Sequence, residues 1–269
     1  MHPPTARSPK AANPATPVAA DLPAPSIASY EEKTLRFATA AWPMRAAEEL
    51  RSALIFRALY KASQRAGLTG DWPARVASGV HDELRHSRLC AEVGARVGAP
   101  RPRYDATPVR ARLSGLPDPL LRAASLLLVE LAIGETISTY LFRAGYRASR
   151  EPLTRAALRS ILGDEVRHQR LGWDAIGALW PTLPEALRAE LQRHAAKGLA
   201  GCEQQTAKPA MLWLKERRPF EPAYAELGVL RPEQRVEAFY FAVERFVVPR
   251  LGRLGLDGAR AWEQRYRAP

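Results

Sequence analysis

Two stretches of the chain are nearly identical. Residues 82–89 read DELRHSRL and residues 164–171 read DEVRHQRL, so six of the eight positions agree. Each stretch contains a Glu and a His three positions apart. Side chains with this spacing lie on the same face of a helix, where a carboxylate and an imidazole point toward one place. The repeat therefore predicts two helices that present equivalent Glu-His pairs.

A second repeat precedes the first. Residues 49–63 (ELRSALIFRALYKAS) and 135–149 (ETISTYLFRAGYRAS) agree at eight of fifteen positions. The two repeats have offsets of 86 and 82 residues, and a longer turn in the first copy absorbs the difference, as expected of insertions. The pattern indicates a duplicated helix hairpin. Glu49 and Glu135 align with each other, which favours them over Glu48 and Glu130, although either of the latter remains an alternative.

Hydrophobic periodicity is helical along nearly all of the chain. It predicts helices over residues 30–41, 43–66, 72–97, 120–148, 153–179, 184–205 and 232–251. Short turns divide each hairpin, and a connection with five prolines (residues 98–119) joins the two hairpins. This order is the layout of a ferritin-like four-helix bundle. The expected fold class is therefore all-α, with two duplicated antiparallel hairpins, a long crossover and extra C-terminal helices.

Three segments follow from this pattern. Residues 1–28 are rich in Pro and Ala and are expected to form a disordered tail. Residues 29–180 are expected to form the bundle with its metal site. Residues 181–269 are expected to form a helical extension that packs on the bundle.

Composition excludes several classes of protein. The 269 residues contain no apolar run long enough for a membrane span, and the N-terminus lacks the apolar region of a secretory signal. The two cysteines, Cys90 and Cys202, show no recognisable spacing and suit free thiols in a cytoplasmic protein. The net charge is +12 and the pI about 10.2. The arginines are mostly scattered and lack interleaved aromatic residues, so we expect no nucleic-acid partner.

The repeated acids and histidines match the ligands of a two-metal site. Four carboxylates carry a charge of −4, which balances two divalent cations, and carboxylate with imidazole suits iron or manganese. The alternative is that these are surface residues paired with arginines. The predicted metal ligands are Glu49, Glu83, His86, Glu135, Glu165 and His168.

Neighbouring residues have predicted supporting roles. Asp82 and Asp164 each precede a ligand Glu, and we expect them to accept the free N–H of a ligand His. Arg85 and Arg167 either bridge these carboxylates or are solvated. Thr139 lies one turn after Glu135 and is the candidate catalytic residue that faces the metal cavity; a core position is the alternative.

The arrangement of Glu49, DELRH, Glu135 and DEVRH resembles the ferritin-like di-iron carboxylate superfamily over residues 43–179. DEVRHQ is similar to the second motif of its desaturases and oxygenases, and the place of Thr139 resembles that in several monooxygenases. Ile161 stands where N-oxygenases carry an additional His, and the chain lacks the paired cysteines of rubrerythrin. The overall likeness is to bacterial ferritin-like domain proteins.

The resemblance implies an oxidoreductase that activates O2 at two iron ions (Fe2+/Fe3+, with manganese as an alternative) to oxidise or hydroxylate a small organic substrate. Electrons would come from an external donor, since the sequence has no flavin or nicotinamide fingerprint, and a homodimer is compatible with this class. Ferroxidase or iron handling is one alternative function. A tRNA hydroxylase and a metal-free helical scaffold are two others.

Overall fold

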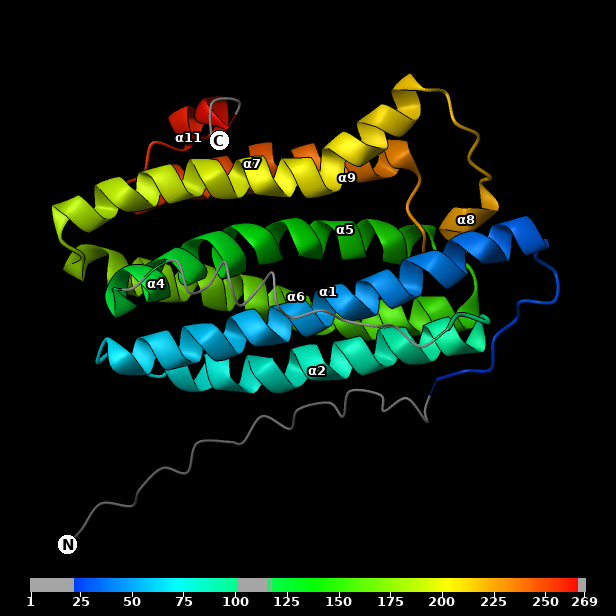
Figure 1. The fold of residues 1–269 in the computed structure, drawn as a ribbon, viewed down its shortest axis with the longest axis horizontal. Helices are drawn as coiled ribbons and strands as arrows, with labels where there is room; N and C mark the ends of the chain where they lie inside the picture. The colour runs from blue at the N-terminus through cyan, green and yellow to red at the C-terminus, as the bar shows by residue number, and fades with distance from the viewer. Residues whose placement is uncertain (1–21, 101–115, 117, 266–269) are drawn as a thin grey trace, which may run out of the picture.

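The computed structural model describes residues 22–100, 116 and 118–265. All regular secondary structure in these residues is helical, which confirms the all-α prediction. Long helices run side by side, and the helices of the C-terminal third form a further layer along one side of them (Figure 1).

The first hairpin consists of α1 (Glu32–Arg65) and α2 (Trp72–Arg96), which pack along their whole lengths. The predicted break before Pro43 was wrong, because α1 continues through this proline. A proline inside a helix removes one backbone hydrogen bond and costs roughly 3 kcal/mol. The fully buried Trp42 and Ala46 on either side provide packing that outweighs this cost.

The second hairpin consists of a composite rod followed by α6 (Pro152–Leu179). The rod contains α4 (Pro119–Leu126), a π-helical stretch η2 (Leu127–Gly134) and α5 (Glu135–Ala148). The sequence predicted one uninterrupted helix over residues 120–148, and the π stretch corrects that prediction. A wider π turn changes the direction in which later side chains point, and such turns are common at functional sites.

Acidic caps define where the second hairpin begins and turns. The carboxylate of Asp118 accepts a hydrogen bond from the backbone N–H of Leu121 at the start of α4. Glu151 accepts hydrogen bonds from Leu153 and Thr154 at the start of α6. Each acid is followed by a proline at the first helical position. A backbone N–H at this position would have no acceptor within the helix, so a proline there costs no hydrogen bond.

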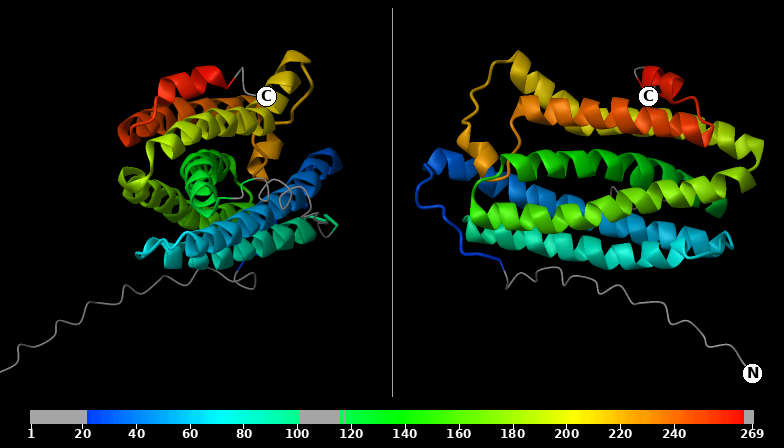
Figure 2. Two further views of the ribbon diagram at one scale, coloured as in Figure 1. Left: turned by 60° about the vertical axis from the view of Figure 1, so that its left-hand side comes forward. Right: turned by 180° about the vertical axis from the view of Figure 1, so that it is seen from behind.

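The two hairpins pack against each other. Helix α6 contacts α2 on one side and both α5 and η2 on the other, and α4 contacts α1. The views in Figures 1 and 2 agree that these four rods run roughly parallel to a common axis.

The C-terminal third covers α5 and η2 on the side away from α2 (Figure 2). Its long helix, α7 (Glu185–Lys215), passes through Pro209 and extends ten residues beyond the predicted end at Gln205. A second helical run lies beside α7. The remaining elements are η3 (Trp180–Thr182), α8 (Ala223–Glu226), α9 (Pro232–Ala242), η4 (Val243–Val247), α10 (Val248–Leu254) and α11 (Gly258–Gln264). Within the described residues, no helix combines the length and the apolar character needed to cross a membrane.

Residues 22–28 belong to the segment that the sequence predicted to be a disordered tail, yet they lie against the helices. Leu22 is buried, and its carbonyl accepts a hydrogen bond from Arg96. The backbone N–H of Ser26 donates to Glu151. Residues 1–21 and most of the long crossover (101–115 and 117) lie outside the described residues.

The apolar core is divided into two clusters of buried side chains. Along α1, residues of one cluster end at Ala46 and residues of the other begin at Ile55. Along α6, the corresponding limits are Ile161 and Leu171. Five of the predicted metal ligands occupy the layer between the clusters, and Glu135 lies at its edge, between Ile133 and Ile137 of one cluster.

Gly172 allows α6 to approach η2 closely, and its substitution tests this packing. A Cβ atom at Gly172 would lie 2.5 Å from the carbonyl carbon of Leu131 and 2.6 Å from the nitrogen of Ala132. We expect Gly172→Ala to lower the free energy of unfolding by about 1–3 kcal/mol, because a backbone must shift to admit the methyl group.

Gly177→Ala in the same helix is the matched control. Nothing lies within 4 Å of the added Cβ atom, so the change should raise the free energy of unfolding by about 0.5–1 kcal/mol. Urea unfolding followed by circular dichroism measures both variants. Equal stabilisation by the two substitutions would contradict the close approach of α6 and η2.

Candidate metal centre

Six acidic and imidazole side chains from the four rods converge on one place. They form two groups of four residues, and within each group the potential ligand atoms lie within 4.8 Å of one another. Glu83 and Glu165 belong to both groups. The first group is completed by Glu49 and His86, and the second by Glu135 and His168.

Each rod contributes to the centre as the duplication suggests. Glu49 lies near the middle of α1, and Glu135 is the first residue of α5, directly after the π stretch. The Glu-x-x-His pairs lie on α2 and α6. The structure thus brings together all six residues that the repeat singled out.

The six side chains are removed from water, and several of their polar atoms lack a hydrogen bond. Their residues are between 0 and 7% exposed. Among the described residues, no hydrogen bond of ordinary geometry reaches either carboxylate oxygen of Glu83, Oε2 of Glu165 or Nδ1 of either histidine. Buried polar atoms without partners are costly and rare. The donor atoms therefore fit a cation, which would satisfy these oxygens and nitrogens together.

The distances bring nitrogen and oxygen donors close to each other. Nδ1 of His86 lies 3.4 Å from Oε1 of Glu165 and 3.5 Å from Oε2 of Glu49. Nδ1 of His168 lies 2.8 Å from Oε1 of Glu83. Carboxylate and imidazole donors this close together could hold a divalent metal ion.

Crowding of the acids changes their protonation. Burial and neighbouring carboxylates raise the pKa of Glu135 well above its usual value. Burial likewise raises the pKa of Glu49, and the contact with His86 only partly offsets this effect. Burial opposes ionisation of Glu83 too, but contacts with His168 and His86 lower its pKa to about 2. Without a cation, the centre therefore compensates its negative charge by holding protons.

The histidines hold part of that compensating charge. Burial disfavours protonation of His168, but the carboxylates of Asp82 and Glu83 raise its pKa to about 10. Asp164 and the surrounding glutamates raise the pKa of His86 in the same way, also against burial. A metal must displace these protons, since only the neutral imidazole binds metal.

The two aspartates hold the histidines in a crossed arrangement. Nε2 of His86 lies 3.0 Å from Oδ2 of Asp164, and Nε2 of His168 lies 3.2 Å from Oδ2 of Asp82. Each aspartate thus accepts the N–H of the histidine on the opposite hairpin. This contact leaves Nδ1 of each ring facing the carboxylates, and loss of the Nδ1 proton would expose the lone pair that a metal binds.

Both repeated arginines contact these aspartates. Nη2 of Arg85 lies 2.8 Å from Oδ1 of Asp82 and also pairs with Asp164. Arg167 pairs with Asp164, and its Nη2 lies 3.7 Å from Oδ2 of Asp82. Of the two predicted alternatives, bridging is the one that the structure shows, although Arg167 is half exposed.

Thr139 is buried, but its hydroxyl is turned toward the backbone. Oγ1 donates to the carbonyl oxygen of Glu135 at 2.7 Å, and the carbonyl oxygen of Glu165 lies 3.3 Å away. Thr139 is also absent from the lining of the cavity described below. This geometry favours the core position that was the alternative to the catalytic role.

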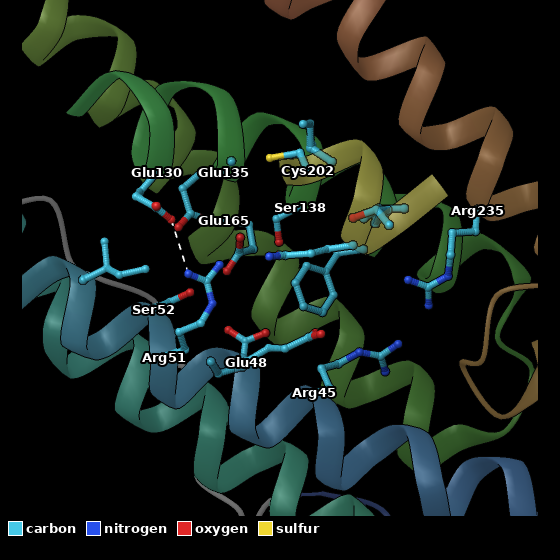
Figure 3. A pocket seen from close by; sticks show the side chains of 18 of the residues that line it. Arg45, Glu48, Arg51, Ser52, Glu130, Glu135, Ser138, Glu165, Cys202 and Arg235 are labelled. Carbon is cyan, nitrogen blue, oxygen red and sulfur yellow. Dashed lines mark hydrogen bonds and ion pairs between the residues drawn. The ribbon is translucent and has the colours of Figure 1, made fainter. Parts of the chain in front are cut away.

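A cavity of about 210 Å³ adjoins the centre and reaches Glu49, Glu135 and Glu165. Figure 3 shows Glu135 and Glu165 at this cavity, with Arg51 and Glu130 at one end and Arg45 and Arg235 at the other. Residues of α7 and of the segment before α9 also line the cavity, namely Cys202, Gln205, Thr206 and Leu230.

Glu48 and Glu130 line this cavity but belong to neither four-residue group. Oε2 of Glu130 lies 3.4 Å from Nη1 of Arg51. The geometry therefore agrees with the preference for Glu49 and Glu135. The sequence analysis missed Arg45, although it lies four residues before Glu49 and on the same helix face. No sequence signal pointed to Arg235.

Substitution of a residue that belongs to both ligand groups should lower the metal content more than substitution of a residue that belongs to one. Because Glu83 belongs to both groups, Glu83→Gln should greatly reduce metal binding at both of them. His86 belongs to one group, so His86→Ala should lower the metal content by less, through loss at that group alone. Elemental analysis after equilibrium dialysis against Fe(II) or Mn(II) measures both. Equal losses in the two variants would contradict a centre with shared carboxylates.

Metal binding should release protons and weaken in acid. Protons occupy the histidines and the high-pKa carboxylates of the metal-free centre. Lower pH adds competing protons, so the affinity for Mn(II) should rise from about pH 6 to about pH 8. Calorimetric titrations in buffers with different ionisation enthalpies count the released protons, and His168→Ala should release fewer. A pH-independent affinity without proton release would argue against this centre.

No protein-family model matches the sequence, and a search of curated proteins finds no match. A function for this chain therefore has to be inferred from its own residues. The residues that carry such an inference are the buried carboxylates and imidazoles of the centre, together with the cavity beside them.

Proposed function

We propose that the protein is a non-haem di-iron oxidoreductase with a ferritin-like four-helix bundle, which activates O2 to oxidise or hydroxylate a small organic substrate. The observation that carries the proposal is the pair of buried four-residue groups that share Glu83 and Glu165. This combination of two single glutamates and two Glu-x-x-His pairs is the known ligand pattern of di-iron and di-manganese carboxylate proteins.

Charge supports two ions rather than one. The six residues include four carboxylates, which balance two divalent cations when both imidazoles are neutral. A single divalent cation would leave two buried negative charges that bound protons would have to balance, whereas two cations balance all four carboxylates without them. The bound ions would supply the electrons and the binding of O2.

The residues of the chain would provide orientation and a dry environment. Asp82 and Asp164 hold the two imidazoles through Nε2. The two apolar clusters lie on either side of the centre along the rods and limit access of water from those directions. Exclusion of water strengthens electrostatic interactions and protects reactive species.

The cavity supports a reaction with a substrate over simple iron storage. It reaches three of the four carboxylates of the centre and has room for only a small group. Its walls combine charged residues with apolar ones such as Ile55, Leu141 and Phe142. Such mixed, concave surfaces are typical of small-molecule sites.

Oxygen consumption by the iron-loaded chain tests the proposal. After anaerobic loading with Fe(II), exposure to O2 should cause rapid uptake and an oxo-bridge absorption band. Glu135→Gln, which removes a predicted ligand, should slow the uptake by more than about 100-fold. Glu130→Gln is the matched control, because Glu130 lines the same cavity but belongs to neither group.

The course of O2 uptake after the first turnover distinguishes an oxidase from a ferroxidase. An oxidase should stop once its bound iron is oxidised and resume only when a reductant is supplied. Continued O2 uptake with excess Fe(II), accompanied by mineral formation, would indicate ferroxidase activity instead. The proposal would fail if Glu135→Gln abolished metal binding and yet left the rate of O2 uptake unchanged.

A further inference from the structure

The cavity beside the metal centre continues into a second, more apolar hollow. This groove has a volume of about 430 Å³ and lies between α1, α7 and the segment before α9. Six residues line both spaces, so the two are contiguous. The shared residues are Arg45, Glu48, Gln205, Thr206, Leu230 and Arg235. A molecule in the groove would therefore reach the cavity that contains Glu135 and Glu165.

Two arginines lie at the junction without a full set of partners. Arg45 donates from Nη2 to the carbonyl oxygen of Gly228 at 3.1 Å, and its guanidinium lies 4.6 Å from the ring centre of Trp42. Its other terminal nitrogen, Nη1, is buried and has no hydrogen-bond partner among the described residues. A buried cationic donor of this kind favours a negatively charged acceptor.

Arg235 faces the same junction from α9 (Figure 3). Within the described part of the chain, no carboxylate oxygen lies within 4.0 Å of its guanidinium. Burial and the positive charge of Arg45 lower its pKa, and Glu48 offsets this effect only in part. The two cations thus repel each other across a space that an anion would neutralise.

The charges limit the anion to a single negative charge. Arg45 and Arg235 contribute two positive charges to the junction, and Glu48 contributes one negative charge. The charge of Arg51 is already balanced by Glu130 at the opposite end of the cavity. A carboxylate matches the remaining charge of +1 better than a phosphate dianion, and its two oxygens suit guanidinium donors.

The groove beyond the arginines suits an apolar body. The ring of Phe37 lies 6.0 Å from that of Trp213 and 6.4 Å from that of Phe220, measured between ring centres. Met44, which is 64% exposed, lines the same groove. These side chains provide an accessible apolar surface next to the cationic junction.

We infer that the site binds a small carboxylic acid, with its carboxylate between Arg45 and Arg235 and its alkyl or aryl body in the groove lined by Phe37, Trp213 and Phe220. The assignment of this acid as the substrate rests on the proposed function, whereas the prediction that the acid binds does not. The carboxylate end of the molecule is then closer to Glu135 and Glu165 than the apolar end. Net charge and apolar surface together determine the selectivity.

Calorimetric binding of decanoate to the full chain tests the inference. Decanoate should bind both the metal-free and the Mn(II)-loaded protein, and decan-1-ol, which has the same chain without the charge, should bind at least about tenfold more weakly. Arg235→Gln should weaken decanoate binding by about tenfold or more and leave binding of the alcohol nearly unchanged. Trp213→Ala should weaken both ligands.

Arg253→Gln is the matched control, since Arg253 is an exposed arginine outside both spaces. It should leave binding of both ligands unchanged, and circular dichroism checks that every variant is folded. Equal binding of acid and alcohol, or no effect of Arg235→Gln, would overturn the inference. Binding is measured without turnover, so a chain that binds decanoate but consumes no O2 would contradict the proposed function alone.

Discussion

The structure depends on one costly feature, a layer of four carboxylates and two imidazoles inside a mostly apolar core. Charges buried without partners destabilise a fold by several kcal/mol each. Here the layer is held by contacts that cross between the hairpins, with Asp164 on His86 and Asp82 on His168. Arg85 and Arg167 in turn compensate the two aspartates. The apolar clusters on either side position the rods that supply these residues.

The C-terminal helices turn this buried layer into a centre with access from one side. They cover α5 and η2, and they leave a cavity that reaches Glu135 and Glu165. The same helices bring Arg235 to face Arg45, so they also determine the charge at the entrance. The candidate metal ligands thus lie in the duplicated hairpins, whereas the proposed small-molecule site lies where the extension meets them.

Much of the centre was predictable because helix geometry is regular. A spacing of three residues places Glu83 beside His86 on any helix, and alignment of the repeats favoured Glu49 over Glu48, in agreement with the structure. The errors arose where packing overrides local preference. Pro43 does not end α1 because Trp42 and Ala46 are buried around it, and the π stretch before Glu135 has no signature in the local sequence.

The sequence by itself determined the helical class, the duplication and the residues able to bind metal, because these follow from periodicity and side-chain chemistry. Only the tertiary structure decided which aspartate contacts which histidine, because both hairpins carry the same motif and local spacing cannot distinguish a crossed pair from an uncrossed one. It also decided that the hydroxyl of Thr139 bonds the backbone and that Arg235 reaches the cavity. Such contacts join residues far apart in the chain, and their geometry is set by how the helices pack.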